Sequence, residues 1–189
     1  MKTVGELVGE AMDLMDRGFY AQAFVPAAAA IAETAKKAYE KDVSSEEDYR
    51  RFLKEHWQLI TFMGMSRALP LPMNVPFGFK RIVPSFNVHQ GAEEIILYVI
   101  NQTLKINKLP DAISLNNQGT FEIKNNRLLL PSGSVSGLLG VVIFHPSNRE
   151  EVIGDKYWIS ISDFKMFISE LWGRMDLAER IMKFYLERD

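Results

Sequence analysis

The sequence contains no cysteine among its 189 residues. Without thiols the protein cannot form disulfide bonds, thiolate-bound zinc sites or iron–sulfur clusters, and it has no cysteine nucleophile. The protein also has no large net charge, because its 22 basic and 24 acidic side chains give a net charge of −2. Domains whose whole surface contacts nucleic acid are usually strongly basic, so any site for an anion must be local.

Long apolar runs are also missing. The two longest, Phe24–Ala32 and Gly137–Phe144, are far shorter than the roughly 18–20 residues that cross a bilayer. Near the N-terminus, Glu6, Glu10 and Asp13 stand where an export signal needs an uncharged apolar stretch. The sequence therefore predicts a cytoplasmic protein that does not interact with membranes.

The composition is that of an ordinary globular protein, with 47% hydrophobic and 24% charged residues, and the length suits a single domain, residues 1–189. Apolar residues at helical spacing predict three helices in an N-terminal part, residues 1–64, and these cover about 3–17, 19–41 and 44–64. Pro26 is expected to kink the second helix or to divide it. Ser44 and Glu47 have the spacing of a capping box at the start of the third helix.

The rest of the chain mixes helix and strand. It is predicted to contain a Pro/Phe-rich loop at 65–90, a helix at 91–108, a β insertion at 118–161 and a C-terminal helical part at 162–189. Within the insertion we predict a hairpin that turns at Asn125-Asn126, a buried strand at Gly137–His145 and a half-buried strand at Tyr157–Ile161. Ser162 is predicted to be the N-cap of the last helical part, which Gly173 divides.

These elements predict an α+β fold. It is mainly a helical bundle of about five helices, with a small, mostly antiparallel β-sheet inserted before the C-terminal helix.

The Pro/Phe-rich loop is the segment most typical of a binding site. From residue 56 to residue 92 there is no acidic side chain, and prolines and phenylalanines are frequent. Long loops of this kind usually carry a function or pack with structure of their own. We expect Phe77, Phe79, Lys80 and Arg81 to be the leading contacts for a ligand or partner. The structural alternative is that the phenylalanines complete the core while Lys80 and Arg81 point into water.

Sequence motifs for catalysis are weak. The three histidines, His56, His89 and His145, have no second ligand at a zinc-binding spacing, so we predict no metal and no cofactor. Ser162 and Lys165 have the Ser-x-x-Lys spacing of serine acyl enzymes, but the other motifs of that class are absent. The glycines at 133, 137 and 140 lead into a predicted strand, whereas a phosphate loop leads into a helix.

The stretch Leu14–Glu40, LMDRGFYAQAFVPAAAAIAETAKKAYE, resembles the opening helices of the HEPN superfamily, helical bundles named for higher eukaryotes and prokaryotes nucleotide-binding. In its nuclease members an arginine precedes a histidine by four to six residues, and the pair cleaves RNA without metal across a dimer. Arg50, Arg51 and His56 stand at such spacings. The resemblance implies that His56 is the acid–base group and that Arg50 or Arg51 stabilises the phosphate. Five residues of an unbroken helix rotate side chains by about 140°, so this site needs two chains or a break in the helix.

Besides a purely structural subunit whose exposed apolar loop is covered by another chain, two functions remain open from the sequence. The first is a non-enzymatic binding or interaction module that uses the loop at 65–89 to contact a protein partner or an anionic small ligand. The alternative is a HEPN-like, metal-independent endoribonuclease that acts on RNA as a homo-oligomer.

Overall fold

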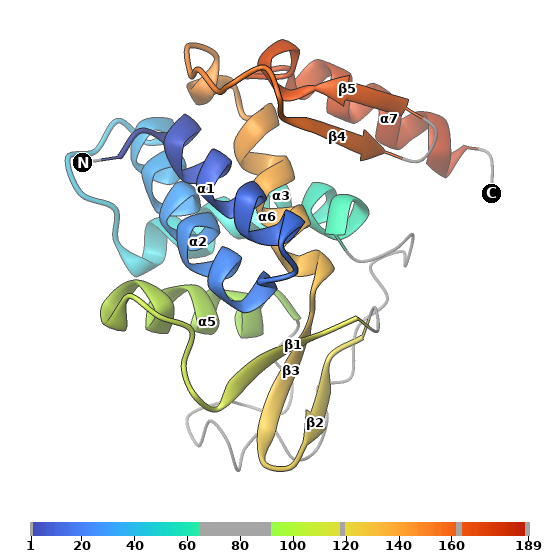
Figure 1. The fold of residues 1–189 in the computed structure, drawn as a ribbon. Coiled ribbons are helices and arrows are strands. Elements are labelled where there is room, and N and C mark those ends of the chain that lie inside the picture. The colour runs from blue at the N-terminus through green and yellow to red at the C-terminus, as the bar shows by residue number, and fades with distance from the viewer. Residues whose placement is uncertain (1, 65–91, 118–119, 162–163, 188–189) are drawn as a thin grey trace.

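The computed structural model describes residues 2–64, 92–117, 120–161 and 164–187. Helices dominate these residues and two small sheets accompany them, which confirms the predicted α+β, mainly helical fold (Figure 1). The helices are α1 (Val4–Asp16), α2 (Tyr20–Ala38), α3 (Glu46–Gly64), α5 (Ala92–Ile106), α6 (Gly133–Phe144) and α7 (Met175–Leu186). The strands are β1 (Ile113–Asn116), β2 (Glu122–Lys124), β3 (Arg127–Pro131), β4 (Trp158–Ile161) and β5 (Phe164–Phe167). Two short 3-10 helices, η1 (Pro146–Asn148) and η2 (Ile168–Glu170), complete the list.

The first two helices, predicted at about 3–17 and 19–41, form a hairpin. A capping box between Thr3 and Glu6 begins α1, and Gly18, with φ of 79°, turns the chain into α2. α2 continues through Pro26 as one helix, so the proline neither ends nor divides it. The two helices pack along each other on one side of the molecule (Figure 1).

The predicted capping box of α3 is displaced by one residue. The Ser45 hydroxyl accepts a hydrogen bond from the Asp48 backbone N–H (3.3 Å), and the Asp48 carboxylate accepts one from the Ser45 N–H (2.8 Å). Ser44 instead donates its hydroxyl to the Ala32 carbonyl (2.9 Å) and so ties this loop to α2. From the sequence, either of the two adjacent serines could cap α3. The hydrogen bond from Ser44 to the Ala32 carbonyl leaves Ser45 as the cap.

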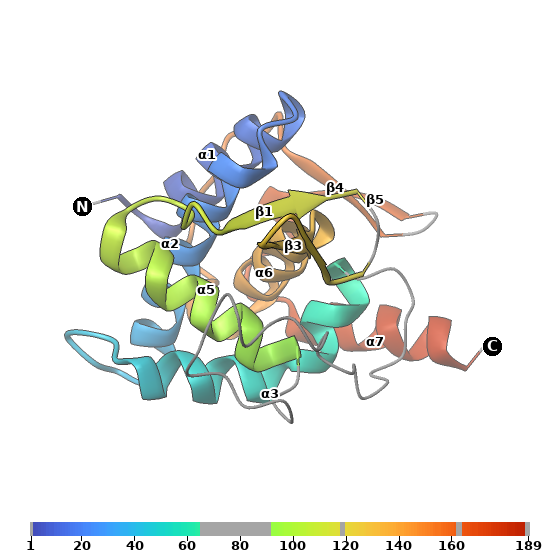
Figure 2. The ribbon, with the colours of Figure 1, turned by 90° about the horizontal axis from the view of Figure 1, so that it is seen from below.

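α6 is the central helix of the molecule, with other elements on all sides (Figure 2). Ten of its twelve residues are buried, and the interior includes Val141, Val142 and Phe144. The prediction of a buried strand at Gly137–His145 is therefore wrong, and the β insertion contains a helix. An apolar run with no polar face has no periodicity that distinguishes a buried helix from a buried strand.

Glycines allow α3 and α6 to cross in close contact. A Cβ atom on Gly137 would overlap the Ile60 carbonyl, and a Cβ on Gly133 would overlap the carbonyl of Gly64. Both α6 glycines face α3, because residues four apart lie on one side of a helix. These glycines therefore belong to a helix and not to the predicted strand, and they allow that helix to pack against α3.

The strands form two separate sheets rather than one. In the first, the order is β1-β3-β2, with β1 parallel to β3 and β2 antiparallel to it. The predicted hairpin turn is confirmed, since Asn125 and Asn126 have φ of 52° and 57°, the conformation of a type I′ turn. The second sheet consists of β4 and β5, paired antiparallel.

The C-terminal region corrects another prediction. Residues 164–167 form β5 where a helix was predicted, and α7 starts only at Met175. Gly173, with φ of 71°, lies just before α7 and not within a helix. In Figure 1, β4, β5 and α7 lie together at one end of the molecule. None of the helices in the described ranges is both long enough and apolar enough to cross a membrane.

Candidate functional site

The four residues predicted to lead ligand binding cannot be placed. Phe77, Phe79, Lys80 and Arg81 lie outside the described residues, in the segment 65–91. Their role stays a prediction from the sequence.

Both arginines of the predicted nuclease pair already have carboxylate partners. Arg50 forms an ion pair with Glu94 of α5. The Nε of Arg51 donates to Glu55 (2.7 Å), and the guanidinium lies over the ring of Tyr39, 4.5 Å from its centroid. The Tyr39 hydroxyl donates to the same carboxylate (2.8 Å). The hydrogen bond from Arg51 holds the pKa of Glu55 below its usual value, so this cluster is a charged network on the surface of α3.

His56 contacts a second histidine instead of an arginine. The His56 and His145 rings meet edge to face with centroids 5.0 Å apart, and Phe52 packs against both, at 4.7 Å and 5.1 Å. His145 lies at the C-terminal end of α6, so the pair joins two helices that are distant in sequence. The structure therefore places His56 in an aromatic cluster.

Burial keeps both imidazoles neutral at pH 7. It lowers the pKa of His56, and it lowers the pKa of His145 to about 4, with a further contribution from the neighbouring His56. The Ser147 backbone N–H donates to Nδ1 of His145 (3.2 Å), so this nitrogen is the acceptor and Nε2 carries the proton. His145 thereby caps η1, and the pair has a structural role in this arrangement.

A metal site is not formed by these groups. Within the described ranges no three side chains of histidine, cysteine, aspartate or glutamate are grouped so that they could hold a metal ion. The charges of Glu55 and Glu179 act on His56, and both do so only through space.

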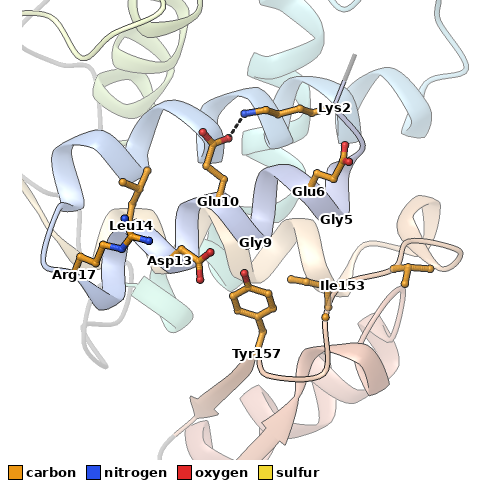
Figure 3. A pocket seen from close by; sticks show the side chains of 12 residues that line it. Lys2, Gly5, Glu6, Gly9, Glu10, Asp13, Leu14, Arg17, Ile153 and Tyr157 are labelled. Carbon is orange, nitrogen blue, oxygen red and sulfur yellow. Dashed lines mark hydrogen bonds and ion pairs between the residues drawn. The ribbon is translucent and has the colours of Figure 1, made fainter.

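A groove of about 660 Å³ runs along α1 and is bounded on its other side by residues 152–157 (Figure 3). Gly5 and Gly9 face this segment, and a Cβ on Gly5 would overlap the carbonyl of Val152. The hydroxyl of Tyr157 lies 3.4 Å from where a Cβ of Gly9 would be. The two glycines thus allow the segment to approach the helix closely.

The charges of the groove are largely paired with one another. Lys2 contacts Glu10 (2.6 Å), Asp13 contacts Lys156 (2.9 Å), and Glu6 is part of the capping box of α1. The hydrogen bond from Lys156 lowers the pKa of Asp13. These pairs leave the groove without a concentration of charge of either sign, so it lacks the convergent polar groups of a ligand site.

The most unusual surface of the described chain is one face of the β4–β5 sheet. We call it the outer face and define it by Trp158, Ser160, Lys165 and Phe167, whose side chains are all exposed. Trp158 and Phe167 lie directly opposite each other on the two strands and are 44% and 50% exposed. The ammonium of Lys165 lies over the Trp158 ring, 3.7 Å from its centroid.

The other face of the same sheet packs inward. Ile159 and Met166 are partly buried against the core, and the ring of Phe164, which is 46% exposed, contacts those of Phe184 and Tyr185 on α7, each at 6.5 Å. Side chains alternate between the faces of a strand, so the inner face anchors the sheet while the outer face is free to meet a partner. The contacts of the inner face thus hold the sheet that carries Trp158 and Phe167 against the rest of the protein.

Analysis of the sequence missed this site because it assigned the residues of β5 to a helix. One signal was available in the sequence: Ile159-Ser160-Ile161 and Phe164-Lys165-Met166 both alternate apolar and polar residues. Two short alternating stretches separated by two residues are typical of a β-hairpin.

Comparisons with known proteins give a match along nearly the whole chain. A family model described as Rv1289 matches residues 3–188. Similar proteins are "Uncharacterized protein Rv1289" of Mycobacterium tuberculosis (strain ATCC 25618 / H37Rv) and "Uncharacterized protein Mb1320" of Mycobacterium bovis. Each is 26% identical over 187 residues, which cover 95% of this chain and 88% of the relative. No solved structure matches.

Proposed function

The chain belongs to the Rv1289 family, and we propose that it is a non-enzymatic interaction module that binds its partner through the outer face of the β4–β5 sheet. One observation carries the proposal: Trp158 and Phe167 stand side by side on neighbouring strands, and each leaves about half of its surface in water. Large aromatic side chains contribute most of the free energy at protein interfaces.

The free energy available from this pair is substantial. Covering the exposed halves of the two side chains would contribute on the order of 2 kcal/mol for each, from about 25 cal/mol per Å² of apolar surface. Phe19 and Ile106 are exposed singly, whereas Phe164 and Phe184, 46% and 44% exposed, form a second aromatic contact between the other face of the sheet and α7. Isolated apolar residues are normal on protein surfaces, whereas an aromatic pair beside a cation is typical of an interface.

The test compares the outer face with a matched surface elsewhere. The tagged chain is isolated from its own host and examined by native mass spectrometry as wild type, as Trp158→Ser with Phe167→Ser, and as Phe19→Ser with Ile106→Ser. Phe19 and Ile106 are 48% and 47% exposed, so both double variants remove similar apolar surface. We expect a retained partner in the wild type and the control, and its loss in the outer-face variant. Retention by the outer-face variant would contradict the proposal.

Metal-independent RNA cleavage is a second candidate, and one observation favours it: His56 has a second neutral imidazole, His145, within ring contact. Paired histidines can act as acid and base in phosphodiester cleavage. The ion pairs of Arg50 and Arg51 count against it, because a phosphate would have to displace Glu94 and Glu55 from the two guanidinium groups.

Cleavage of a labelled RNA in the presence of a chelator decides between the two functions. The interaction-module proposal expects no cleavage. Cleavage by the wild type that His56→Ala abolishes would replace it with the nuclease function, whereas cleavage that survives in His56→Ala would identify a contaminating enzyme.

A further inference from the structure

We infer that an extended, carboxylate-bearing segment of another protein joins the β4–β5 sheet as a third strand at an outer edge, where its side chains lie beside the outer face. This inference rests on the proposed function and names the chemical class of its partner. Three features support it: the unpaired edges of the sheet, the positive charge of Lys165, and the repulsion that two Lys165 side chains would cause between two copies of the chain.

The first step concerns the edges of the sheet. Among the described strands, β4 and β5 pair only with each other, so each has an outer edge that no described strand covers. Two strands alone form a marginal sheet, and an open edge is a template for a further strand. Addition of an extended peptide to such an edge is a common mode of recognition.

The hydrogen-bond register places these free backbone groups beside the aromatic pair. The Ile168 N–H donates to the Tyr157 carbonyl (3.1 Å), which makes these two residues a hydrogen-bonded pair. Bonded and non-bonded pairs alternate along an antiparallel ladder, so Trp158 and Phe167, the next pair, are non-bonded. Their N–H and C=O groups therefore point toward the outer edges. An added strand would thus bond to residues whose side chains form the outer face.

The second step concerns charge. Lys165 is the only ionisable residue of the four that define the outer face, and its ammonium meets no carboxylate in the described part of the chain. Lys156, by contrast, is paired with Asp13 beside the groove. A carboxylate on the partner would pair with this exposed ammonium, which the ring of Trp158 holds in place.

The same lysine argues against a second copy that pairs through β5. If two β5 strands paired antiparallel about a two-fold axis, the Lys165 side chains of the two copies would be brought opposite or diagonal to each other. Like charges at such positions destabilise a sheet. A lysine on an edge strand is also a common means of preventing self-association.

The test uses the full chain with a photoreactive p-benzoylphenylalanine in place of Phe167, irradiated in cells of its own host. Matched chains carry the same group at Phe19, which is similarly exposed, or combine position 167 with Lys165→Glu or Lys165→Arg. The inference expects a protease-sensitive adduct at position 167 and none at position 19. Mass spectrometry should map it to one extended segment that contains aspartate or glutamate.

The lysine variants test the charge, and hydrogen exchange tests the added strand. Lys165→Glu should reduce the adduct at least tenfold, while Lys165→Arg should keep most of it. In the complex, the amides of one outer edge, those of Trp158 and Ser160 or those of Lys165 and Phe167, should exchange at least tenfold more slowly. Unchanged exchange at both edges would overturn the added strand.

The remaining outcomes separate this inference from the proposed function. A nuclease-sensitive adduct, an adduct between two copies of this chain, or one unaffected by Lys165→Glu would overturn the inference and leave the interaction module standing. No adduct above the position 19 control would overturn both.

Discussion

α6 and the β4–β5 sheet are both built from apolar sequence, yet one is almost entirely buried and the other leaves three aromatic side chains exposed. α6 has no polar face and lies in the centre, where Phe144 is completely buried. The sheet has two different faces, and its outer face leaves Trp158 and Phe167 half exposed. Apolar content alone therefore does not distinguish a core element from a binding surface; the distribution of neighbours around the element does.

The largest effect is expected at the buried end of this comparison. Phe144→Ala should lower the free energy of unfolding by about 3–5 kcal/mol, because it removes a fully buried ring and leaves a cavity among well-packed neighbours. Urea denaturation followed by circular dichroism measures the change. A loss below about 1 kcal/mol would mean that α6 is not the centre of the core.

A second substitution tests the close crossing of α3 and α6. Gly137→Ala should cost about 1–3 kcal/mol, because the new methyl group overlaps the backbone carbonyl of Ile60, which cannot move without shifting α3. Gly154→Ala is the control, since the nearest atom to its added Cβ is in the ring of Tyr157 at 3.8 Å. Equal stability of the two variants, measured by the same denaturation, would contradict the close crossing.

The histidine pair at the end of α6 predicts a dependence of stability on pH. The folded pKa of His145 is about 4, below the ordinary value of 6.5, so between these values the unfolded chain binds more protons. The contribution of His145 is therefore full above pH 6.5, is lost as the pH falls toward 4 and then levels off. One histidine can contribute at most about 1.4 kcal/mol per pH unit.

His145→Asn isolates this effect from other titrating groups. The asparagine oxygen can still accept the Ser147 N–H bond that caps η1, but it does not titrate. The difference in unfolding free energy between wild type and variant, measured from pH 7.5 to pH 4, should shrink or change sign toward acid. A difference that stays constant over this range would show that His145 titrates normally in the folded chain.

Much of the helical frame was predictable from local signals. The helices α1, α3 and α5 have one apolar face and clear ends, and the turn at Asn125-Asn126 has residues that tolerate positive φ. α6 was predicted as a strand because an apolar run of its length fits either structure, and only the surrounding helices determine which one forms. β5 was assigned to a helix because Phe164 and Ile168, four residues apart, also fit one face of a helix.

The candidate site was less predictable than the fold. His56 stood out in the sequence, but its contact with His145 depends on the crossing of two helices that are distant in sequence. The outer face depends on a register that sets Trp158 opposite Phe167, and no local pattern reveals which face of the sheet packs on α7. Tertiary packing determines both, so the sequence alone could identify residues but not their neighbours.

The smallest expected effect lies within β5 and sharpens the comparison to two adjacent residues. Met166 points inward and is partly buried, whereas Phe167 points outward. Met166→Ala should cost about 1–2 kcal/mol, while Phe167→Ala should cost less than about 1 kcal/mol, the usual contribution of one cross-strand pair. Partner binding should show the reverse order, with retention in Met166→Ala and loss in Phe167→Ala. If Phe167→Ala proved the more destabilising change, the outer face would be part of the core rather than a binding surface, since a surface kept for recognition contributes little to folding.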